Sequence, residues 1–291
     1  MQKFDENDNN RATKLAKSRA GTVIGIAEDK VKRFLGIPYA SDTSGENRFC
    51  APCPPPLLVN FEAFSFGEIC PQSYRRFSRQ AENCLTLNIW SPDDNKTHPV
   101  LVYIHGGSFM SGAGSSPLFN GSNFARDQKL TVVTFNYRLG ALGFLDFSSL
   151  GGGAVANPGL HDVILLLHWV EDNIAAYGGD LDRITVMGES AGGTIASILP
   201  CLPETSDVLA GAVISSGIPT GLISKEEGKD IARKYLEFMG VDSIEALRGI
   251  PAETIGNRNQ QFSQYLDSGV TTYLPVVDGD LFLDFPMRLL Q

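Results

Sequence analysis

The sequence predicts an α/β fold whose mostly parallel sheet carries helices on both faces. Two apolar, β-branched runs, at residues 100–104 and 130–135, are typical of strands that are covered on both sides, as in parallel sheets. Apolar residues recur at helical spacing from 160 to 177, and strand-like and helical segments alternate after that point. This alternation is typical of a chain built from strand–helix–strand units.

The first third of the chain is predicted to consist of strands and loops. Short apolar runs at 21–26 and 31–37 flank a polar turn, which indicates a β-hairpin. A loop rich in proline, serine and aromatic residues follows from 38 to about 82. The alternating run at 85–90 then predicts the next strand.

The last third alternates between short strands and helices. Its periodicity predicts strands at 184–187 and 213–214, and helices at 191–199, 224–239 and 243–249. We see no internal repeat and no linker that divides the chain in two.

Charge and composition exclude several classes of protein. The 291 residues include 24 Lys and Arg and 33 Asp and Glu, a net charge of −9. This balance argues against nucleic-acid binding, which requires a basic face. No apolar run approaches the roughly 20 residues that span a bilayer, and no export signal opens the sequence, so we expect a cytoplasmic protein with no membrane partner. Residues 1–20 are expected to form a disordered lead-in to one domain at 21–291.

The five cysteines do not by themselves indicate a disulfide framework, since their number is odd and no export signal precedes them. Cys50 and Cys53 have the spacing of a redox pair. Prolines surround them, however, where a redox motif needs the start of a helix. We therefore interpret these two as incidental loop cysteines.

Residues 188–192, Gly-Glu-Ser-Ala-Gly, form the clearest catalytic pattern in the chain. A predicted strand precedes them and a predicted helix follows, which is the context that a G-x-S-x-G nucleophile elbow requires. The glycines leave room for a strained turn that presents the hydroxyl of Ser190 at the carboxyl end of the sheet. The pattern predicts Ser190 as the nucleophile of an acyl-transfer reaction.

A second segment supplies the amides that such a reaction needs. His105-Gly106-Gly107 follows the buried strand at 100–104, and glycines let the backbone approach a substrate closely. Taken alone, the segment would be interpreted as a plain glycine turn. Together with the elbow it predicts an oxyanion hole formed by the amides of Gly106, Gly107 and Ala191.

At this point the sequence resembles the type-B carboxylesterase and cholinesterase family of α/β-hydrolases. The resemblance runs from about Gly21 to the last residue. Besides the elbow and the His105 segment, it rests on residues 36–40 (GIPYA), 82–90 (ENCLTLNIW), 136–140 (NYRLG), 157–160 with Asp162, 169–170 (WV), 177–180 (YGGD) and 275–279 (PVVDG).

The resemblance implies an α/β-hydrolase fold, a serine esterase activity on a small carboxylic ester, and no cofactor or metal ion. Ser190 matches the nucleophile and Gly106, Gly107 and Ala191 match the oxyanion hole. Glu189, beside the nucleophile, is assigned a supporting role. Ser216 matches a serine that supports the family's triad, or it is a simple hydroxyl at a strand end.

The resemblance also bears on the loop that precedes residue 84. Cys70 and Cys84 match the family's first disulfide-bonded loop; they would pair in a secreted protein and stay reduced in the cytoplasm. Cholinesterases carry a tryptophan there to hold a quaternary ammonium group. Residues 71–83 contain Tyr74 and Phe77 but no tryptophan, so choline esters are not the expected substrates.

The two remaining members of a catalytic triad are missing from the sequence. In this fold the acid and the histidine follow the serine, whereas all four histidines of this chain precede Ser190. His105 is expected to orient the oxyanion segment. His98, His161 and His168 are expected to make local contacts, because the base must come from a loop at the carboxyl end of the sheet. The chain thus resembles the N-terminal part of a longer, C-terminally truncated esterase.

Two functions remain open at this level. The first is a serine esterase whose present chain has little or no turnover, and the alternative is a non-catalytic binding module of the same fold. Retention of Ser190 favours the first. The strand at 213–216 is expected to form an uncovered sheet edge, which predicts self-association.

Overall fold

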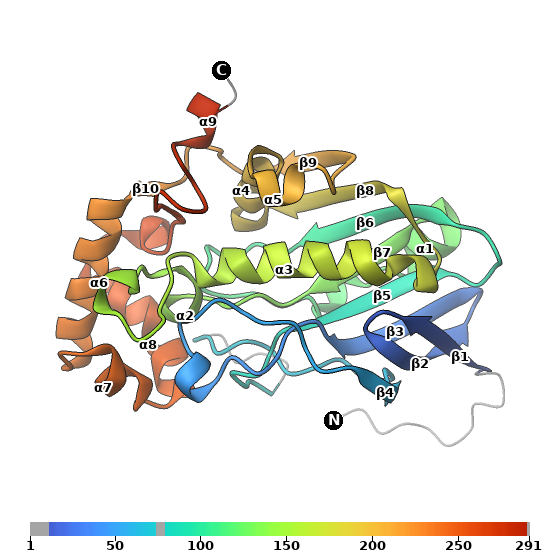
Figure 1. The fold of residues 1–291 in the computed structure, drawn as a ribbon, viewed down its shortest axis with the longest axis horizontal. Coiled ribbons are helices and arrows are strands. Elements are labelled where there is room, and N and C mark those ends of the chain that lie inside the picture. The colour runs from blue at the N-terminus through green and yellow to red at the C-terminus, as the bar shows by residue number, and fades with distance from the viewer. Residues whose placement is uncertain (1–11, 74–78, 290–291) are drawn as a thin grey trace.

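The computed structural model describes residues 12–73 and 79–289. Its centre is a nine-stranded sheet whose main path runs β1-β2-β3-β5-β7-β6-β8-β9, with β4 paired to β2 beside that path (Figure 1). The strands are β1 (Ala12–Ser18), β2 (Gly21–Glu28), β3 (Val31–Pro38), β4 (Leu58–Glu62), β5 (Thr86–Pro92), β6 (His98–Ile104), β7 (Thr131–Phe135), β8 (Gly179–Glu189) and β9 (Gly211–Ser215). A separate parallel pair joins β10 (Ile223–Ser224) to β11 (Val276–Val277).

Helices connect and cover these strands. They are α1 (Ser122–Gln128), α2 (Ala141–Phe144), α3 (Pro158–Asn173), α4 (Ala191–Ile198), α5 (Pro203–Ser206), α6 (Lys225–Met239), α7 (Ile244–Arg248), α8 (Ala252–Tyr265) and α9 (Pro286–Leu289). The strands and helices predicted between residues 85 and 249 are confirmed, with ends that differ by a few residues.

The sheet is mixed, so the expectation of a mostly parallel sheet holds for one side only. Strands β7, β6, β8 and β9 run parallel to one another, whereas β1, β2, β3 and β5 pair antiparallel with their neighbours along the path. The predicted hairpin of β2 and β3 is part of the reason. Its turn residues Asp29 and Lys30 both have positive φ, which reverses the chain directly. Parallel neighbours instead require long crossovers.

Helices cover both faces of the sheet, as predicted. Residues of α3 and α4 belong to the main hydrophobic cluster of the protein, together with Ile89 of β5. Ala125 of α1 packs in a second cluster that includes Trp90 and Leu35. Ile89 and Trp90 are consecutive but belong to different clusters, because successive strand residues point to opposite faces.

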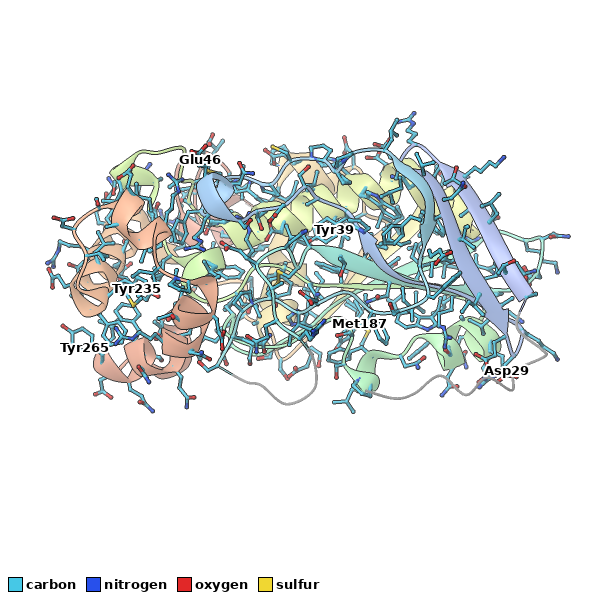
Figure 2. All side chains as sticks on the ribbon, turned by 90° about the horizontal axis from the view of Figure 1, so that it is seen from below. Asp29, Tyr39, Glu46, Met187, Tyr235 and Tyr265 are labelled. Atoms are coloured by element: carbon cyan, nitrogen blue, oxygen red, sulfur yellow. A yellow bond between two sulfur atoms is a disulfide. The ribbon has the colours of Figure 1, made fainter. Side chains whose placement is uncertain are left out.

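Helices α6, α7 and α8, which we call the helical cap, gather at the end of the sheet toward which β6 and β8 run (Figure 1). Ser224 and Glu227 form a capping box that fixes the start of α6. The rings of Tyr235 in α6 and Phe262 in α8 pack edge to face, with centroids 4.8 Å apart. Figure 2 shows Tyr235 and Tyr265 in this cap, at the opposite end of the molecule from the β2–β3 turn at Asp29.

Two predictions for the outer parts of the chain need correction, and one helix was not predicted. The lead-in expected at 1–20 is wrong for Ala12–Ser18, which pairs with β2 as strand β1; residues 1–11 lie outside the described residues. The strand was missed because Lys14 and Lys17 are three residues apart and therefore lie on opposite faces, so the segment shows no apolar–polar alternation. Strand β4 lies within the predicted loop at 38–82, and α8 was not predicted.

No helix within residues 12–73 and 79–289 is both long enough and apolar enough to cross a bilayer.

Candidate active site

Ser190 occupies the turn between strand β8 and helix α4. Its φ of 56° and ψ of −120° lie in a region that non-glycine residues rarely adopt, so the turn is strained. Two hydrogen bonds hold this geometry: its N–H donates to the carbonyl of Ser215 in β9 (2.9 Å), and its own carbonyl accepts from Thr194 in α4 (2.9 Å). The predicted strand–elbow–helix arrangement is therefore present.

The glycines around Ser190 are required by close backbone packing. A Cβ on Gly192 would stand 2.1 Å from the carbonyl oxygen of Ile104 in β6, and one on Gly193 would stand 2.6 Å from that of Ser215. A Cβ on Gly188 would meet the carbonyl of Gly192 at 2.1 Å. The elbow is thus wedged between β6 and β9, and no side chain fits at these positions.

The segment 105–112, which we call the oxyanion loop, begins where β6 ends and folds against the elbow. A Cβ on Gly106 would lie 2.7 Å from the carbonyl oxygen of Glu189 and 3.1 Å from the Cβ of Ser190. Gly107 has a φ of 117°, and its carbonyl accepts from the N–H groups of Met110 (3.0 Å) and Ser111 (3.1 Å). The structure therefore brings Gly106 directly against Ser190, with Gly107 next to it in the chain.

His105 anchors this loop as a neutral side chain. Burial lowers the pKa of His105 to about 4, against the opposing effect of its hydrogen bond to the carbonyl of Gly106. A carbonyl only accepts, so Nδ1 carries the proton and donates over 2.9 Å. The ring stacks on Tyr137 with centroids 4.4 Å apart, and the Tyr137 hydroxyl donates to the His105 carbonyl (2.7 Å). This supports the expected orienting role.

The other histidines have local contacts of the kind expected. His98 at the start of β6 contacts Asp94 over 2.8 Å, and His168 on α3 lies 3.7 Å from Glu171. Asp162 does not form a dyad with His161, because its carboxylate binds the backbone and guanidinium of Arg138. Within the described residues, none of the four histidines forms a hydrogen bond with the Ser190 hydroxyl.

Two residues assigned supporting roles lie close to the elbow. Glu189 is exposed at the end of β8, directly against Gly106. Ser216 is exposed just beyond β9 and has a φ of 52°. Neither side chain makes a hydrogen bond to another described residue, so their contribution to catalysis stays a prediction.

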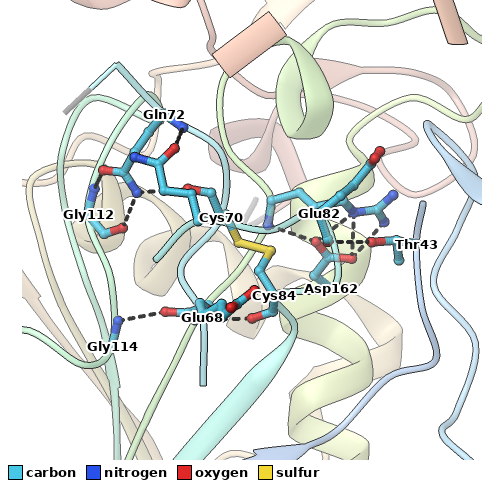
Figure 3. The surroundings of a disulfide bond; sticks show 12 residues. Thr43, Glu68, Cys70, Gln72, Glu82, Cys84, Gly112, Gly114 and Asp162 are labelled. Atoms are coloured by element: carbon cyan, nitrogen blue, oxygen red, sulfur yellow. Dashed lines mark hydrogen bonds and ion pairs between the residues drawn. A yellow bond between two sulfur atoms is a disulfide. The ribbon is translucent and has the colours of Figure 1, made fainter. Parts of the chain in front are cut away.

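Cys70 and Cys84 form a disulfide with Cα atoms 5.1 Å apart, which resolves the alternative left open by the sequence (Figure 3). Cys50, Cys53 and Cys201 are free thiols. The loop closed by the disulfide reaches Glu82, whose carboxylate pairs with the buried guanidinium of Arg48.

Two buried arginines that sequence reasoning missed connect this region to the rest of the fold. Arg48 also donates to the carbonyls of Arg248 (2.9 Å) and Ile250 (2.6 Å), so it fastens the helical cap to the disulfide loop. Arg138 binds Asp162 at 2.6 Å with both side chains almost fully buried. No local pattern reveals these pairs, because their members are 34 and 24 residues apart.

The described part of the chain contains no cluster of three or more histidine, cysteine or acidic side chains that could bind a metal ion.

A sequence model of the carboxylesterase family matches residues 12–291, nearly the whole chain. The chain belongs to the carboxylesterase family. The type-B family and the α/β-hydrolase fold predicted from the motifs are thereby confirmed. The match begins at the start of β1, nine residues before the domain boundary predicted at Gly21.

Relatives of this carboxylesterase-family chain are longer than the chain itself. The para-nitrobenzyl esterase of Bacillus subtilis (strain 168) is 40% identical over an alignment of 246 residues, with 81% of this chain and 50% of that relative covered. The cholinesterase of Mus musculus is 34% identical, with 93% of this chain and 49% of the relative covered. The chain thus spans about half the length of the curated relatives it matches.

Solved carboxylesterase structures superpose closely on the chain. A structure described as PNB esterase gives a TM-score of 0.90 at 35% identity and covers 96% of this chain and 60% of that one. The crystal structure of the Geobacillus stearothermophilus carboxylesterase at pH 6.2 gives 0.85 at 38% identity, covering 95% and 58%.

Proposed function

We propose that these residues form the nucleophile and oxyanion part of a serine esterase that acts on small carboxylic esters. The observation that carries the proposal is the strained turn at Ser190, with Gly106 packed against it. The Ser190 hydroxyl attacks the ester carbonyl, and the amides of Gly106, Gly107 and Ala191 stabilise the oxyanion. The alcohol leaves, and water releases the acyl group from the serine.

The base that takes the serine proton is not among the histidines of this chain. We therefore propose that the 291-residue chain turns over slowly by itself, because a serine hydroxyl is a poor nucleophile at neutral pH without a neighbouring base. The names of relatives such as para-nitrobenzyl esterase support an ester substrate. Choline esters are not proposed, on the sequence of 71–83; Tyr74 and Phe77 lie outside the described residues.

The test supplies the missing base as free imidazole. With p-nitrophenyl acetate and imidazole, we expect an acetyl group to accumulate on the chain, detected by intact mass and assigned to Ser190 by peptide mapping. Ser190→Ala removes this adduct. The matched control is Ser197→Ala, whose hydroxyl donates to the carbonyl of Thr194 within α4 and lies outside the elbow. Acetylation that is unchanged in Ser190→Ala contradicts the proposal.

We also propose that the chain self-associates through β9, with a second copy as the partner. In the described residues β9 pairs with β8 on one side only. Val213 and Ile214 are exposed on it, and Gly211–Ser215 contains no charged residue and no proline. Strand edges without such residues pair readily with other chains.

A further inference from the structure

The side-chain amide of Gln72, which is buried, forms hydrogen bonds with the oxyanion loop. This residue lies two positions after Cys70 and is 2% exposed. Its Oε1 accepts a hydrogen bond from the N–H of Gly112 (3.0 Å), and its Nε2 donates to the carbonyls of Gly112 (2.9 Å) and Cys70 (3.0 Å). Figure 3 shows the Gln72 side chain facing Gly112 beside the disulfide.

Only a primary amide satisfies this arrangement. A rotated amide would place its NH₂ against the N–H of Gly112 and its oxygen against two carbonyl oxygens, so the observed orientation is the one that pairs each donor with an acceptor. A carboxylate at position 72 would still accept from Gly112 but would repel both carbonyls. Chemical identity, rather than size, is therefore what the site demands.

Gly112 connects the Gln72 side chain to the proposed oxyanion hole. Its φ is 117°, and a Cβ there would stand 2.3 Å from Nδ1 of His105 and 2.6 Å from the carbonyl oxygen of Gly106. The backbone at Gly112 thus lies directly against the ring that bonds to Gly106. Because the His105 ring is also packed against Tyr137, we expect a displacement of Gly112 to change the position of Gly106.

The disulfide connects the Gln72 contact to a second carboxamide contact, which is made by Asn136. The Asn136 side chain donates to the carbonyl of Cys84 (3.1 Å) and accepts from the N–H of Gly114 (2.9 Å). Each half of the Cys70–Cys84 disulfide is therefore hydrogen-bonded to a carboxamide that holds the segment 112–114. The disulfide therefore links the two backbone segments to which these carboxamides are hydrogen-bonded.

We propose that Gln72 is a positioning residue for the oxyanion hole, and that the Cys70–Cys84 disulfide holds Gln72 in place. Through Gly112 and His105 it keeps the amides of Gly106 and Gly107 in register with Ser190. The catalytic meaning of this arrangement rests on the proposed function. The mechanical link does not, since it concerns only the position and mobility of the loop.

The first test measures amide hydrogen exchange at single glycines by NMR. In Gln72→Ala we expect exchange at Gly106, Gly107 and Gly112 to accelerate at least about tenfold, because both hydrogen bonds between Gln72 and Gly112 are lost. Ala191 is expected to keep its rate, since it belongs to α4. Unchanged rates at Gly106 and Gly107 overturn the proposal.

The matched control is Ser73→Ala in the same loop. The Ser73 hydroxyl donates to the carbonyls of Gly256 (3.0 Å) and Asn257 (3.1 Å) in α8 instead of the oxyanion loop. We expect faster exchange in α8 and unchanged exchange at Gly106 and Gly107. Equal acceleration of the oxyanion loop in both variants would mean general loosening and would overturn the specific role of Gln72.

Gln72→Glu adds a readout that depends on chemistry. The ionised side chain repels the Gly112 and Cys70 carbonyls, whereas the protonated acid restores a donor. The amide shifts of Gly106 and Gly107 are therefore expected to move toward the wild-type positions as the pH falls. Wild-type protein over the same pH range is the control for shifts that arise from other ionisable groups, such as His105 within the loop. Shifts without this pH dependence overturn the proposal.

Reduction tests the role of the disulfide. Dithiothreitol converts Cys70 and Cys84 to two thiols by exchange and is itself oxidised to a cyclic disulfide. We expect faster exchange at Gly106 and Gly107 in the reduced wild type, and little further increase in reduced Gln72→Ala, since both act through one contact. Fully additive increases overturn the link.

One measurement needs no variant. The side-chain NH₂ protons of Gln72 in the unmodified protein are expected to exchange far more slowly than those of an exposed glutamine, and equal rates overturn the proposal. None of these experiments uses turnover. A failure to acetylate Ser190 would therefore count against the proposed esterase function and leave the Gln72 result standing.

Discussion

The middle of the sheet and its outer strand β9 are built from the same kinds of residue but differ in what covers them. Val102, Val133 and Val186, in β6, β7 and β8, are fully buried. Val213 and Ile214 in β9 are 46% and 48% exposed. A β-branched run thus predicts a strand in both places. Its burial depends on neighbours that the run itself does not specify.

Ser190 lies on the border between these two regions. Its elbow packs through Gly192 against the carbonyl of Ile104 in β6, and its N–H binds Ser215 in β9. The site therefore lies between β6, a buried strand of the central sheet, and β9, which has a neighbouring strand on one side only. Changes in the two regions are expected to affect the protein very differently.

The largest loss of stability is expected from the buried ion pair next to β7. Asp162→Asn leaves the buried Arg138 guanidinium without its charge partner, which costs about 3–5 kcal/mol of unfolding free energy. Urea denaturation measures the loss. The control is Asp230→Asn on the exposed face of α6, where the ion pairs with Arg233 and Lys234 lie in solvent and a far smaller change is expected. Equal losses would mean that burial of the pair is unimportant.

The next effect is a pH dependence that originates in the oxyanion loop. The folded-state pKa of His105 is about 4, below the unfolded value of 6.5, so the unfolded chain binds the proton more readily. The contribution of neutral His105 to the free energy of unfolding is fully present above about pH 6.5. As the pH falls to 4, this contribution decreases by about 3 kcal/mol.

His105→Asn keeps a donor near the Nδ1 position but does not titrate, so stability measured between pH 7 and 4 is expected to fall less steeply. Burial also lowers the pKa of His161, so a residual slope of the same sign remains. A wild-type slope in His105→Asn would contradict the assignment.

A smaller difference is expected from one valine in each region. Val186→Ala leaves a cavity in the middle of the sheet and is expected to cost about 2 kcal/mol. Val213→Ala removes a half-exposed side chain of β9 and is expected to change the unfolding free energy by less than about 0.5 kcal/mol. Parallel urea titrations of the two variants give the comparison, and similar costs would show that β9 is as well covered as β8.

The smallest effect on unfolding, but a clear one on association, is expected from a charge on β9. Ile214→Lys places a lysine on the free edge and should shift the chain from oligomer to monomer in size-exclusion chromatography with light scattering. Leu15→Lys on β1 is the matched control; Leu15 is 56% exposed and its strand already carries Lys14 and Lys17. A wild-type chain that is monomeric at all concentrations contradicts the proposed self-association.

The sequence alone determined the local parts of the site. Strand, elbow and helix around Ser190 follow from a buried apolar run, from glycines that a tight turn requires, and from a helical period, all within about fifteen residues. The place of the His105 segment after a buried strand was equally local. These patterns are visible within short segments, whereas the contacts of Gly192 with β6 and of Gly193 with β9 form only in the folded chain.

Only the tertiary structure decided which distant groups support that site. Gln72 and Gly112 are 40 residues apart, and Arg138 and Asp162 are 24 apart, so nothing in the neighbourhood of either residue specifies its partner. The antiparallel half of the sheet and the exposure of β9 are likewise results of which strands become neighbours. Hydrogen bonds and burial of this kind depend on how the whole chain packs, and a local pattern carries no record of that packing.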